Sequence, residues 1–337
     1  MDAPAPSEAA APRAFRRTLI KVAVSLVVLA ACGWYFWKKV DLAGAWSALV
    51  QADYWLVAAA AVVNMVLHLP AKSVRWWLML APMKRLPQHR VYNYLLAGYA
   101  ASNLLPARMG EAVRIWFVAK DGVPVGGATG TQLLEKVYEV LGLIVFVLPL
   151  PLVLPELPGS ARIAIALVGV GGVVGVVVMY FVARHGEKSG GTTRLARLLK
   201  KIGEGMANLR APRALALAIL LSIATWVIDA WAVILCMHAV GIEPSFWAAA
   251  FMLLGLNLAI ALPSTPAQLG VFEGSIVIAL EILGLPRDRA LAFAVLYHVM
   301  QIVPVTLYGG IMLARYGVPK PPEPTGASEI KEPGTRS

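Results

Sequence analysis

Residues 103–114 read NLLPARMGEAVR and lie between the apolar runs VYNYLLAGYAAS and IWFVA. Hydropathy places this stretch in or against a bilayer, yet it carries Arg108, Glu111 and Arg114 beside a proline and a glycine. Each such charge costs about 2.5–3.5 kcal/mol at the bilayer centre, so three cost on the order of 7–10 kcal/mol against lipid. Two environments avoid this cost: a water-filled cavity in which the charges find partners, or a surface loop just outside the headgroups.

The amino-acid composition indicates the class of protein. Of the 337 residues, 59% are hydrophobic and only 15% are charged, whereas a soluble domain has a larger charged fraction. Several segments also exceed the roughly 18 apolar residues that cross a bilayer. The net charge of +11 gathers at the ends of apolar runs, where it sets membrane orientation, and it does not point to nucleic acid. The composition predicts an all-α polytopic membrane protein.

The apolar runs predict the organisation of the chain. We expect one transmembrane domain over residues 19–315, disordered tails at 1–18 and 316–337, and a basic loop at 184–213. The distribution of Lys and Arg places the loop and both termini in the cytoplasm. It places there too the segment with Lys72, Arg75, Lys84, Arg85 and Arg90. Six full spans are expected near residues 19–37, 54–80, 128–152, 162–183, 214–239 and 290–313.

Two apolar regions, 91–119 and 246–284, are interrupted in the middle. The first is broken by Pro106 and Gly110, after which about ten helical residues remain, roughly 15 Å or half a bilayer. The second is broken by ALPSTPAQLG, which contains Pro263, Pro266 and Gly270. We predict that each region is a re-entrant hairpin of two half-helices.

The two hairpins belong to an internal repeat. PARMG at 106–110 recurs as PAQLG at 266–270. In the same way, GVP at 122–124 in the first copy corresponds to GLP at 284–286 in the second. The repeat halves cover about 54–152 and 214–313. Three full spans separate the hairpins, so the second copy is expected upside down. Many transporters use such inverted repeats to build a site reachable from both faces.

Charged residues near the hairpins are the candidate site. Arg108, Glu111 and Arg114 recur every three residues and can pair on neighbouring turns. On the next span Glu135 and Glu139 share a face, and Lys136 lies beside them. These residues are expected to face the bundle interior, either as a salt-bridge lock that holds the hairpin or in direct contact with a substrate.

The second half is mostly neutral. Glu273 is its acid next to the hairpin. Asp229 fits either hydrogen bonding between helices or a coupling site, and His298 fits either packing or a proton carrier. The sequence has no P-loop, no HExxH, no Cys/His cluster and no Gly-x-Ser-x-Gly motif. We therefore expect no enzyme activity, no metal and no cofactor.

Four segments together carry a family resemblance: NLLPARMGEAVR, LLEKVYE, LPSTPAQLGVFE, and LYH followed by Pro304. They resemble the lysylphosphatidylglycerol synthase transmembrane-region family, a flippase-like membrane domain, over roughly 54–315. His298 stands where Arg is common in that family, and Lys136 and Glu139 stand where Arg and Asp are more usual. The residues that match the family pattern are Pro106, Gly110, Glu111, Arg114, Glu135, Pro263, Pro266, Gly270 and Glu273.

The resemblance implies a flippase or scramblase of the bacterial inner membrane that moves a phospholipid, or an isoprenoid or hopanoid-type lipid, between leaflets. Arg108 and Arg114 would then hold an anionic or phosphate-bearing headgroup. The local charge would be set by Glu111, Glu135, Lys136, Glu139 and, from the opposite half, Glu273. Two alternatives stay open: a non-transporting membrane subunit of a lipid or glycolipid synthesis complex, and a lipid-modifying transferase.

Overall fold

The computed structural model describes residues 30, 32–104, 109–155, 157–188, 212–243, 245–261 and 266–317. Within these ranges every regular element is a helix, which confirms the predicted all-α class. The predicted tail at 1–18 lies outside the described residues, as do Pro106, Arg108 and Pro263 and most of the basic loop.

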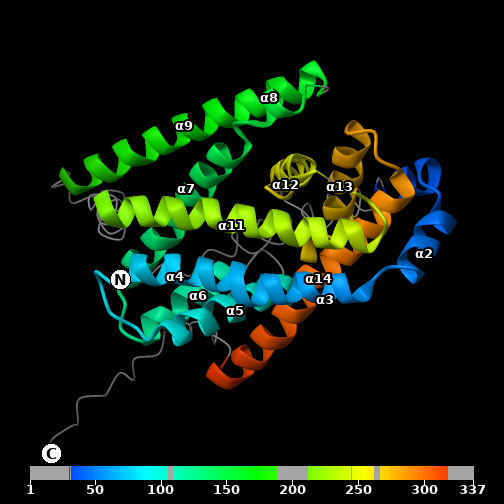
Figure 1. Ribbon diagram of the computed structural model, residues 1–337. Coiled ribbons are helices and arrows are strands. Elements are labelled where there is room, and N and C mark those ends of the chain that lie inside the picture. The colour runs from blue at the N-terminus through cyan, green and yellow to red at the C-terminus, as the bar shows by residue number, and fades with distance from the viewer. Residues whose placement is uncertain are drawn as a thin grey trace, which may run out of the picture.

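Two sets of helices repeat the same order along the chain (Figure 1). In each set a long helix is followed by two shorter helices and a second long helix. The first set comprises α3 (Tyr54–Val63), a π-helical turn η1 (Asn64–His68), α4 (Leu69–Leu80), α5 (Gln88–Leu104), α6 (Gly110–Lys120) and α7 (Val125–Val147). The second comprises α11 (Pro212–Ala239), α12 (Phe246–Ile260), the short η4 (Pro266–Gln268), α13 (Val271–Ile282) and α14 (Arg287–Tyr316).

The matched sequence motifs occupy equivalent places in the two sets. Gly110 is the first residue of α6 and Gly270 is the N-cap of α13. Pro124 and Pro286 precede α7 and α14 with nearly the same backbone angles, φ −58° and ψ 130° against φ −61° and ψ 129°. Outside the repeat lie α2 (Leu42–Val50), α8 (Leu150–Val153) and α9 (Gly159–Lys188).

Length and hydropathy identify 4 helical segments in the described chain that can cross a membrane, and they are the bounding helices of the two sets: Tyr54–Leu80, Val125–Val153, Ala216–Ala239 and Arg287–Tyr316. The prediction of six spans is thus confirmed for these four and not for the other two. The span near 19–37 lies mostly outside the described residues, and that near 162–183 falls on the 30-residue helix α9, which is described in full only over its first part, Gly159–Gly175.

The first helices of the two sets run antiparallel. The backbone N–H of Asp53, just before α3, donates to the carbonyl of Ala239 at the end of α11, with N···O 2.9 Å. At the other end, Arg75 on α4 donates to Ser222 near the start of α11. Figure 1 shows α3–α4 and α11 side by side in this orientation. The first helices of the two sets therefore point in opposite directions.

Each interrupted region folds as two shorter helices packed against each other, α5 with α6 and α12 with α13. With 11 residues, α6 is about 16 Å long and too short to cross a bilayer. Helix α5 packs most extensively on α14 of the other set, and α12 contacts α7. Each pair of short helices is therefore held between bounding helices of both sets.

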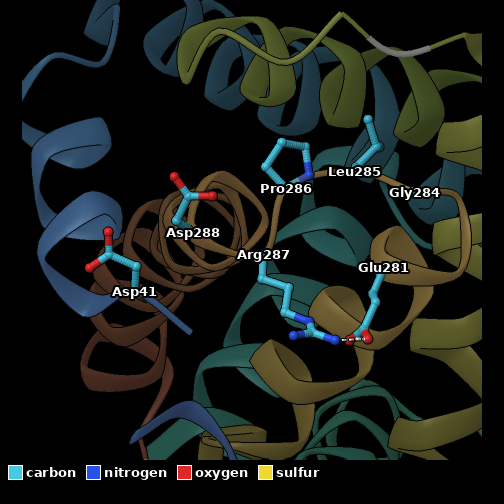
Figure 2. Close-up of a pocket in the computed structure, with 7 residues that line it drawn as sticks. All are labelled: Asp41, Glu281, Gly284, Leu285, Pro286, Arg287 and Asp288. Carbon is cyan, nitrogen blue, oxygen red and sulfur yellow. Dashed lines mark hydrogen bonds and ion pairs between the residues drawn. The ribbon is translucent and has the colours of Figure 1, made fainter. Parts of the chain in front are cut away.

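The turn from α13 to α14 carries a surface cavity of about 410 Å³ (Figure 2). Arg287 forms an ion pair with Glu281 across this turn, and the hydrogen bond from Arg287 lowers the pKa of the Glu281 carboxyl. The remaining lining residues are Asp41, Gly284, Leu285, Pro286 and Asp288. None of the residues predicted to bind lipid lines this cavity.

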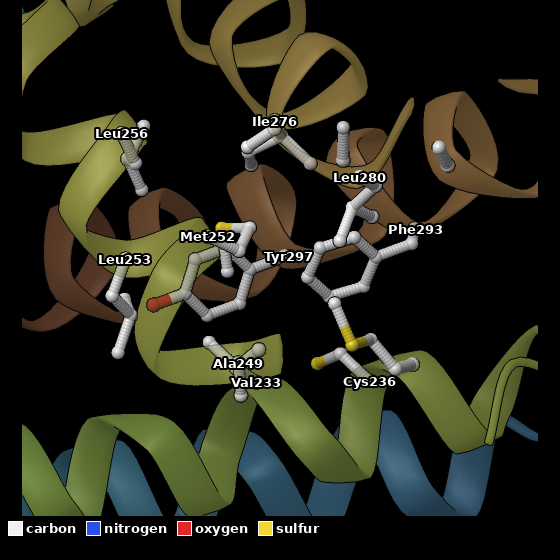
Figure 3. Packing of buried hydrophobic residues seen from close by; sticks show 14 of the residues in the cluster. Val233, Cys236, Ala249, Met252, Leu253, Leu256, Ile276, Leu280, Phe293 and Tyr297 are labelled. Carbon is white, nitrogen blue, oxygen red and sulfur yellow. The ribbon is translucent and has the colours of Figure 1, made fainter. Parts of the chain in front are cut away.

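Apolar packing joins the four helices of the second set (Figure 3). Val233 and Cys236 of α11 face Met252 of α12, Leu280 of α13 and Phe293 of α14, and all are buried. A second buried cluster around Trp76, Leu95, Phe117 and Tyr138 fills the first set. The hairpins are thus part of the packed interior and not surface additions.

Two adjacent glycines on α14 show how closely the two sets of helices approach each other. A Cβ at Gly309 would lie 2.1 Å from the carbonyl oxygen of Leu96 on α5, whereas a Cβ at Gly310 meets nothing within 4 Å. We expect Gly309→Ala to lower the free energy of unfolding by about 1–3 kcal/mol, because the backbone contact must open. Gly310→Ala should be neutral or slightly stabilising, since alanine favours helix. Unfolding in detergent micelles measures both, and equal losses would contradict the close contact.

Candidate functional site: a buried cluster of charged side chains

Two glycines, one on each helix, allow the two helices of the first hairpin to pack closely. A Cβ at Gly110 on α6 would lie 2.0 Å from the carbonyl oxygen of Gly98 on α5, and a Cβ at Gly98 would lie 2.3 Å from Cγ of Arg114. Only glycine allows α5 and α6 to approach this closely and lets the Arg114 side chain cross the surface of α5. The need for Gly110 was predicted; that for Gly98 was not.

Arg114 and Glu135 form a buried ion pair between α6 and α7. Arg114 Nη2 donates to Glu135 Oε2 at 2.6 Å, and the two side chains are 5% and 2% exposed. The Arg114 guanidinium also lies over the ring of Trp76, with Cζ 4.1 Å from the ring centroid. Paired and stacked in this way, the charge is tolerated away from water. The ion pair that a salt-bridge lock requires is present between the hairpin and the next span.

Arg75 on α4 is the residue that sequence reasoning missed. It was grouped with cytoplasmic basic residues, but its side chain is 0% exposed. Nη1 donates to Ser222 Oγ at 2.7 Å, and Nη2 donates to Glu139 Oε1 at 3.2 Å and lies 3.7 Å from Glu135 Oε1. A signal was present: Asn64, His68, Lys72 and Arg75 recur at helical spacing along one face of the α3–α4 span.

The remaining charges lie progressively closer to the surface. Lys72 and Glu139, 3.7 Å apart, have side chains 23% and 22% exposed. Lys136 lies 3.4 Å from Glu139 and 3.8 Å from Glu111. Lys136 and Glu111 are more than half exposed. We call the whole set the charged cluster: Lys72, Arg75, Glu111, Arg114, Glu135, Lys136 and Glu139. Its four cations and three carboxylates give a net charge of +1.

The second hairpin has its own buried pair, with the charges reversed. Glu273 on α13 contacts His298 on α14, with Oε1 and Nδ1 2.5 Å apart, and its other oxygen accepts the Gly270 N–H at 2.7 Å. The second ring nitrogen of His298 lies 2.9 Å from the carbonyl oxygen of Ala267. Both ring nitrogens thus face acceptors, an arrangement that imidazolium satisfies with two donated bonds.

His298 also holds a strained turn. Ala267 and Gln268 at the hairpin tip have positive φ values of 52° and 62°, which cost energy for side chains other than glycine. The bond to Ala267 and the stacking of Phe272 on the His298 ring, 3.9 Å between centroids, keep this tip in place. In both halves, therefore, an ionisable pair ties the second hairpin helix to the following span.

A third polar group lies between the two halves. Asp229 Oδ1 on α11 accepts from Tyr297 at 2.8 Å and from Gln301 at 3.3 Å, both on α14, and lies 3.6 Å from His68 Nδ1. Asn64, the first residue of the π-helical turn, contacts His68 and Gln301. We call these residues the Asp229 site. The predicted hydrogen bonding between helices is confirmed.

Comparison with known proteins agrees with this architecture. The model of the lysylphosphatidylglycerol synthase transmembrane-region family matches residues 19–309, which includes both hairpins and all three polar groups. The chain belongs to this family. It is also similar to the UPF0104 membrane protein MJ1078 of Methanocaldococcus jannaschii, with 22% identity over 218 residues, 63% of this chain and 92% of that protein.

In this family member the predicted site residues gather in separate places. Glu111, Arg114, Glu135, Lys136 and Glu139 meet in the charged cluster. Glu273 and His298 pair with each other at the second hairpin, and Asp229 lies between the halves. Of the proposed hairpin-shaping residues, Gly110 and Gly270 stand at helix starts, and Pro266 opens η4. The roles of these residues in binding lipid stay predictions.

Proposed function

We propose that this membrane protein moves a lipid with an anionic, phosphate-bearing headgroup between the two leaflets of a bacterial inner membrane. The observation that supports this is the charged cluster, whose exposure rises from fully buried Arg75 to half-exposed Lys136. Ionisable groups inside a helical membrane bundle are costly and commonly mark the pathway of a polar substrate. Family membership supports the same proposal.

The gradation in exposure suggests two roles within the cluster. Arg75, Arg114 and Glu135 lie in the interior as ion-paired neighbours and form a fixed base. Lys72 and Lys136 lie nearer the surface and share Glu139, so a phosphate can replace that carboxylate as their partner. A phosphodiester carries one negative charge, which would neutralise the net +1 of the cluster. Arg108, a few residues ahead of Glu111, would add a further cation.

The fold suggests how a headgroup gains access from both sides. With the first helices antiparallel, the two hairpins would enter the bilayer from opposite faces, both termini would lie in the cytoplasm, and the acyl tails would stay in the lipid. In this proposal the lipid leaves chemically unchanged. A partner enzyme that makes the lipid is compatible with it.

The test is lipid exchange in proteoliposomes of phosphatidylethanolamine and phosphatidylglycerol that contain a headgroup-labelled phosphatidylglycerol. A membrane-impermeant quencher reports the fraction of label in the outer leaflet over time. We expect exchange with the wild-type protein and about tenfold slower exchange with Lys136→Gln, which loses one charge-assisted hydrogen bond to phosphate. The control is Lys120→Gln, an exposed lysine at the end of α6 whose ammonium lies over Trp116.

The other outcomes of the lipid-exchange assay would each support a different function. No exchange by a folded wild-type protein would contradict transport, and co-purification with a lipid-synthesis enzyme would then favour the role of a membrane subunit. A change in the mass of the labelled lipid would indicate a transferase. Equal slowing in the Lys120 and Lys136 variants would show that the charged cluster does not lie on the pathway of the lipid headgroup.

A further inference from the structure

The Asp229 site contains a carboxylate that binds no permanent cation among the residues that the structure describes. Asp229 is buried, and Tyr297 and Gln301, the two residues that donate to its Oδ1, are neutral. The ring of His68 lies 3.6 Å away and is also buried. A buried carboxylate is costly unless it is paired or protonated. A proton on either Asp229 or His68 meets this need.

The charged and titratable groups around Asp229 have other partners or are neutral. From α4, Lys72 is paired with Glu139 of α7, and Arg75 is bound to Glu139 and Ser222. From α14 the group facing Asp229 is the phenol of Tyr297. From α11 itself it is the thiol of buried Cys236. The Asp229–His68 pair thus has a net charge of −1 without a shared proton and 0 with it.

We propose that Asp229 and His68 form a proton-binding site whose occupancy is coupled to binding of the anionic headgroup at the charged cluster. This inference rests on the proposed lipid movement and names its energy source. The step forms one O–H or N–H bond with a proton taken from water on one side of the membrane. The same bond breaks when the proton leaves on the other side, and no other reactant is needed.

Lys72 supplies the physical link between the two places. It is one helical turn beyond His68, which lies 3.6 Å from Asp229, and it forms an ion pair with Glu139, so its charge acts on both carboxylates. When Asp229 is unprotonated, its negative charge attracts Lys72. When the pair holds a proton, that attraction is lost and Lys72 is held by Glu139, whose place a phosphate can take. Proton and lipid therefore favour each other's binding, and the coupling is reciprocal.

The position of the site fits such a coupling. His68 lies in the first half, Asp229 and Tyr297 lie in the second, and their contact spans the antiparallel helices α3–α4 and α11. Asn64 and His68 bound a π-helical turn inside the span, an irregularity found often at functional sites. Any movement of one half against the other must therefore alter the Asp229–His68 contact.

The experiment uses the same proteoliposomes with a pH difference of one unit across the membrane and the electrical potential clamped by ionophores. We expect labelled phosphatidylglycerol to accumulate in one leaflet, up to about tenfold for one proton per lipid, and the direction to reverse with the gradient. Asp229→Asn keeps acceptors for Tyr297 and Gln301, so it should still exchange lipid but lose the response. Asp288→Asn, at the opposite end of α14 from the cytoplasmic terminus, should respond like the wild type.

Exchange by the wild type that ignores the gradient would overturn the proton site and leave lipid movement intact. A normal gradient response in Asp229→Asn would also overturn it. Should Asp229→Asn move no lipid, a second measurement decides. Short-chain phosphatidylglycerol is added to detergent-solubilised protein in weak buffer, and proton uptake is expected with the wild type and Asp288→Asn but not with Asp229→Asn. Binding by the wild type without proton uptake would refute the coupling.

Discussion

Replacing Arg114 by alanine is expected to lower the free energy of unfolding by about 3–5 kcal/mol, the usual cost of leaving one member of a buried ion pair without its partner. Glu135 is 2% exposed, and with Arg114 gone its nearest cation is Arg75, whose Nη2 is 3.7 Å away. The stacking of the guanidinium on Trp76 is lost at the same time. Equilibrium unfolding in detergent micelles measures the change.

Two matched variants separate charge from packing. In Arg114→Met with Glu135→Leu both charges are replaced by apolar groups of similar size, and most of the stability should return. Arg90→Ala breaks the ion pair with Asp121 on the same hairpin, but Arg90 is 42% exposed and its loss should matter little. A double variant as unstable as Arg114→Ala would show that the buried charges are not what the single substitution disturbs.

The breaks and the repeat of the fold could be predicted from sequence because they rest on local chemistry. Proline and glycine weaken a helix where they cluster, so Pro106, Gly110 and Gly270 marked the hairpins without tertiary information. The recurrence of PARMG as PAQLG indicated two equivalent halves, which the order of the helices and their antiparallel first members bear out. Partners for Arg108 and Arg114 on the next span were one of two predicted alternatives, because hairpin and next span are adjacent in the chain.

Contacts between distant helices could not be predicted in the same way. Arg75 was placed in the cytoplasm because it stands among other basic residues, but its partner Ser222 lies on a helix of the other half. Gly98 carries no signal until α6 is packed against it. The π-helical turn at Asn64–His68 has no sequence marker, although it places His68 beside Asp229. Pairing across an interface depends on helix rotation, which hydropathy does not report.

In each half, a pair of ionisable side chains joins the second hairpin helix to the following span, but the acidic and basic residues are exchanged between the two halves. In the first half the hairpin helix supplies the cation and the following span the carboxylate; in the second half α13 supplies Glu273 and α14 supplies His298. The first pair joins a wider network of charges. Apart from their bond to each other, the hydrogen bonds of Glu273 and His298 in the described residues go to the backbone of their own hairpin. Because its polar attachment away from the surface is this one pair, we expect the second hairpin to be the easier one to release.

Glu273→Ala is accordingly expected to open the second hairpin and to cost about 3–5 kcal/mol. The substitution leaves the buried His298 without its counter-charge, which is the larger effect. It also removes the acceptor for the Gly270 N–H at the start of α13, a capping bond worth about 1 kcal/mol. Glu273→Gln keeps an acceptor for that N–H and should lose less. Unfolding in detergent gives the stability of each variant.

Opening is measured by labelling Gln268→Cys at the hairpin tip with a membrane-impermeant maleimide, in protein whose Cys32 and Cys236 are replaced by alanine. Labelling should be fastest with Glu273→Ala, slower with Glu273→Gln and slowest with the parent. Glu281→Ala is the matched control, because it removes a glutamate of α13 that is also paired with α14, through Arg287, but at the surface. If Glu281→Ala exposes the tip as much as Glu273→Ala does, the hairpin is not held by the buried pair, and the strained backbone at Ala267 and Gln268 must be held by packing alone.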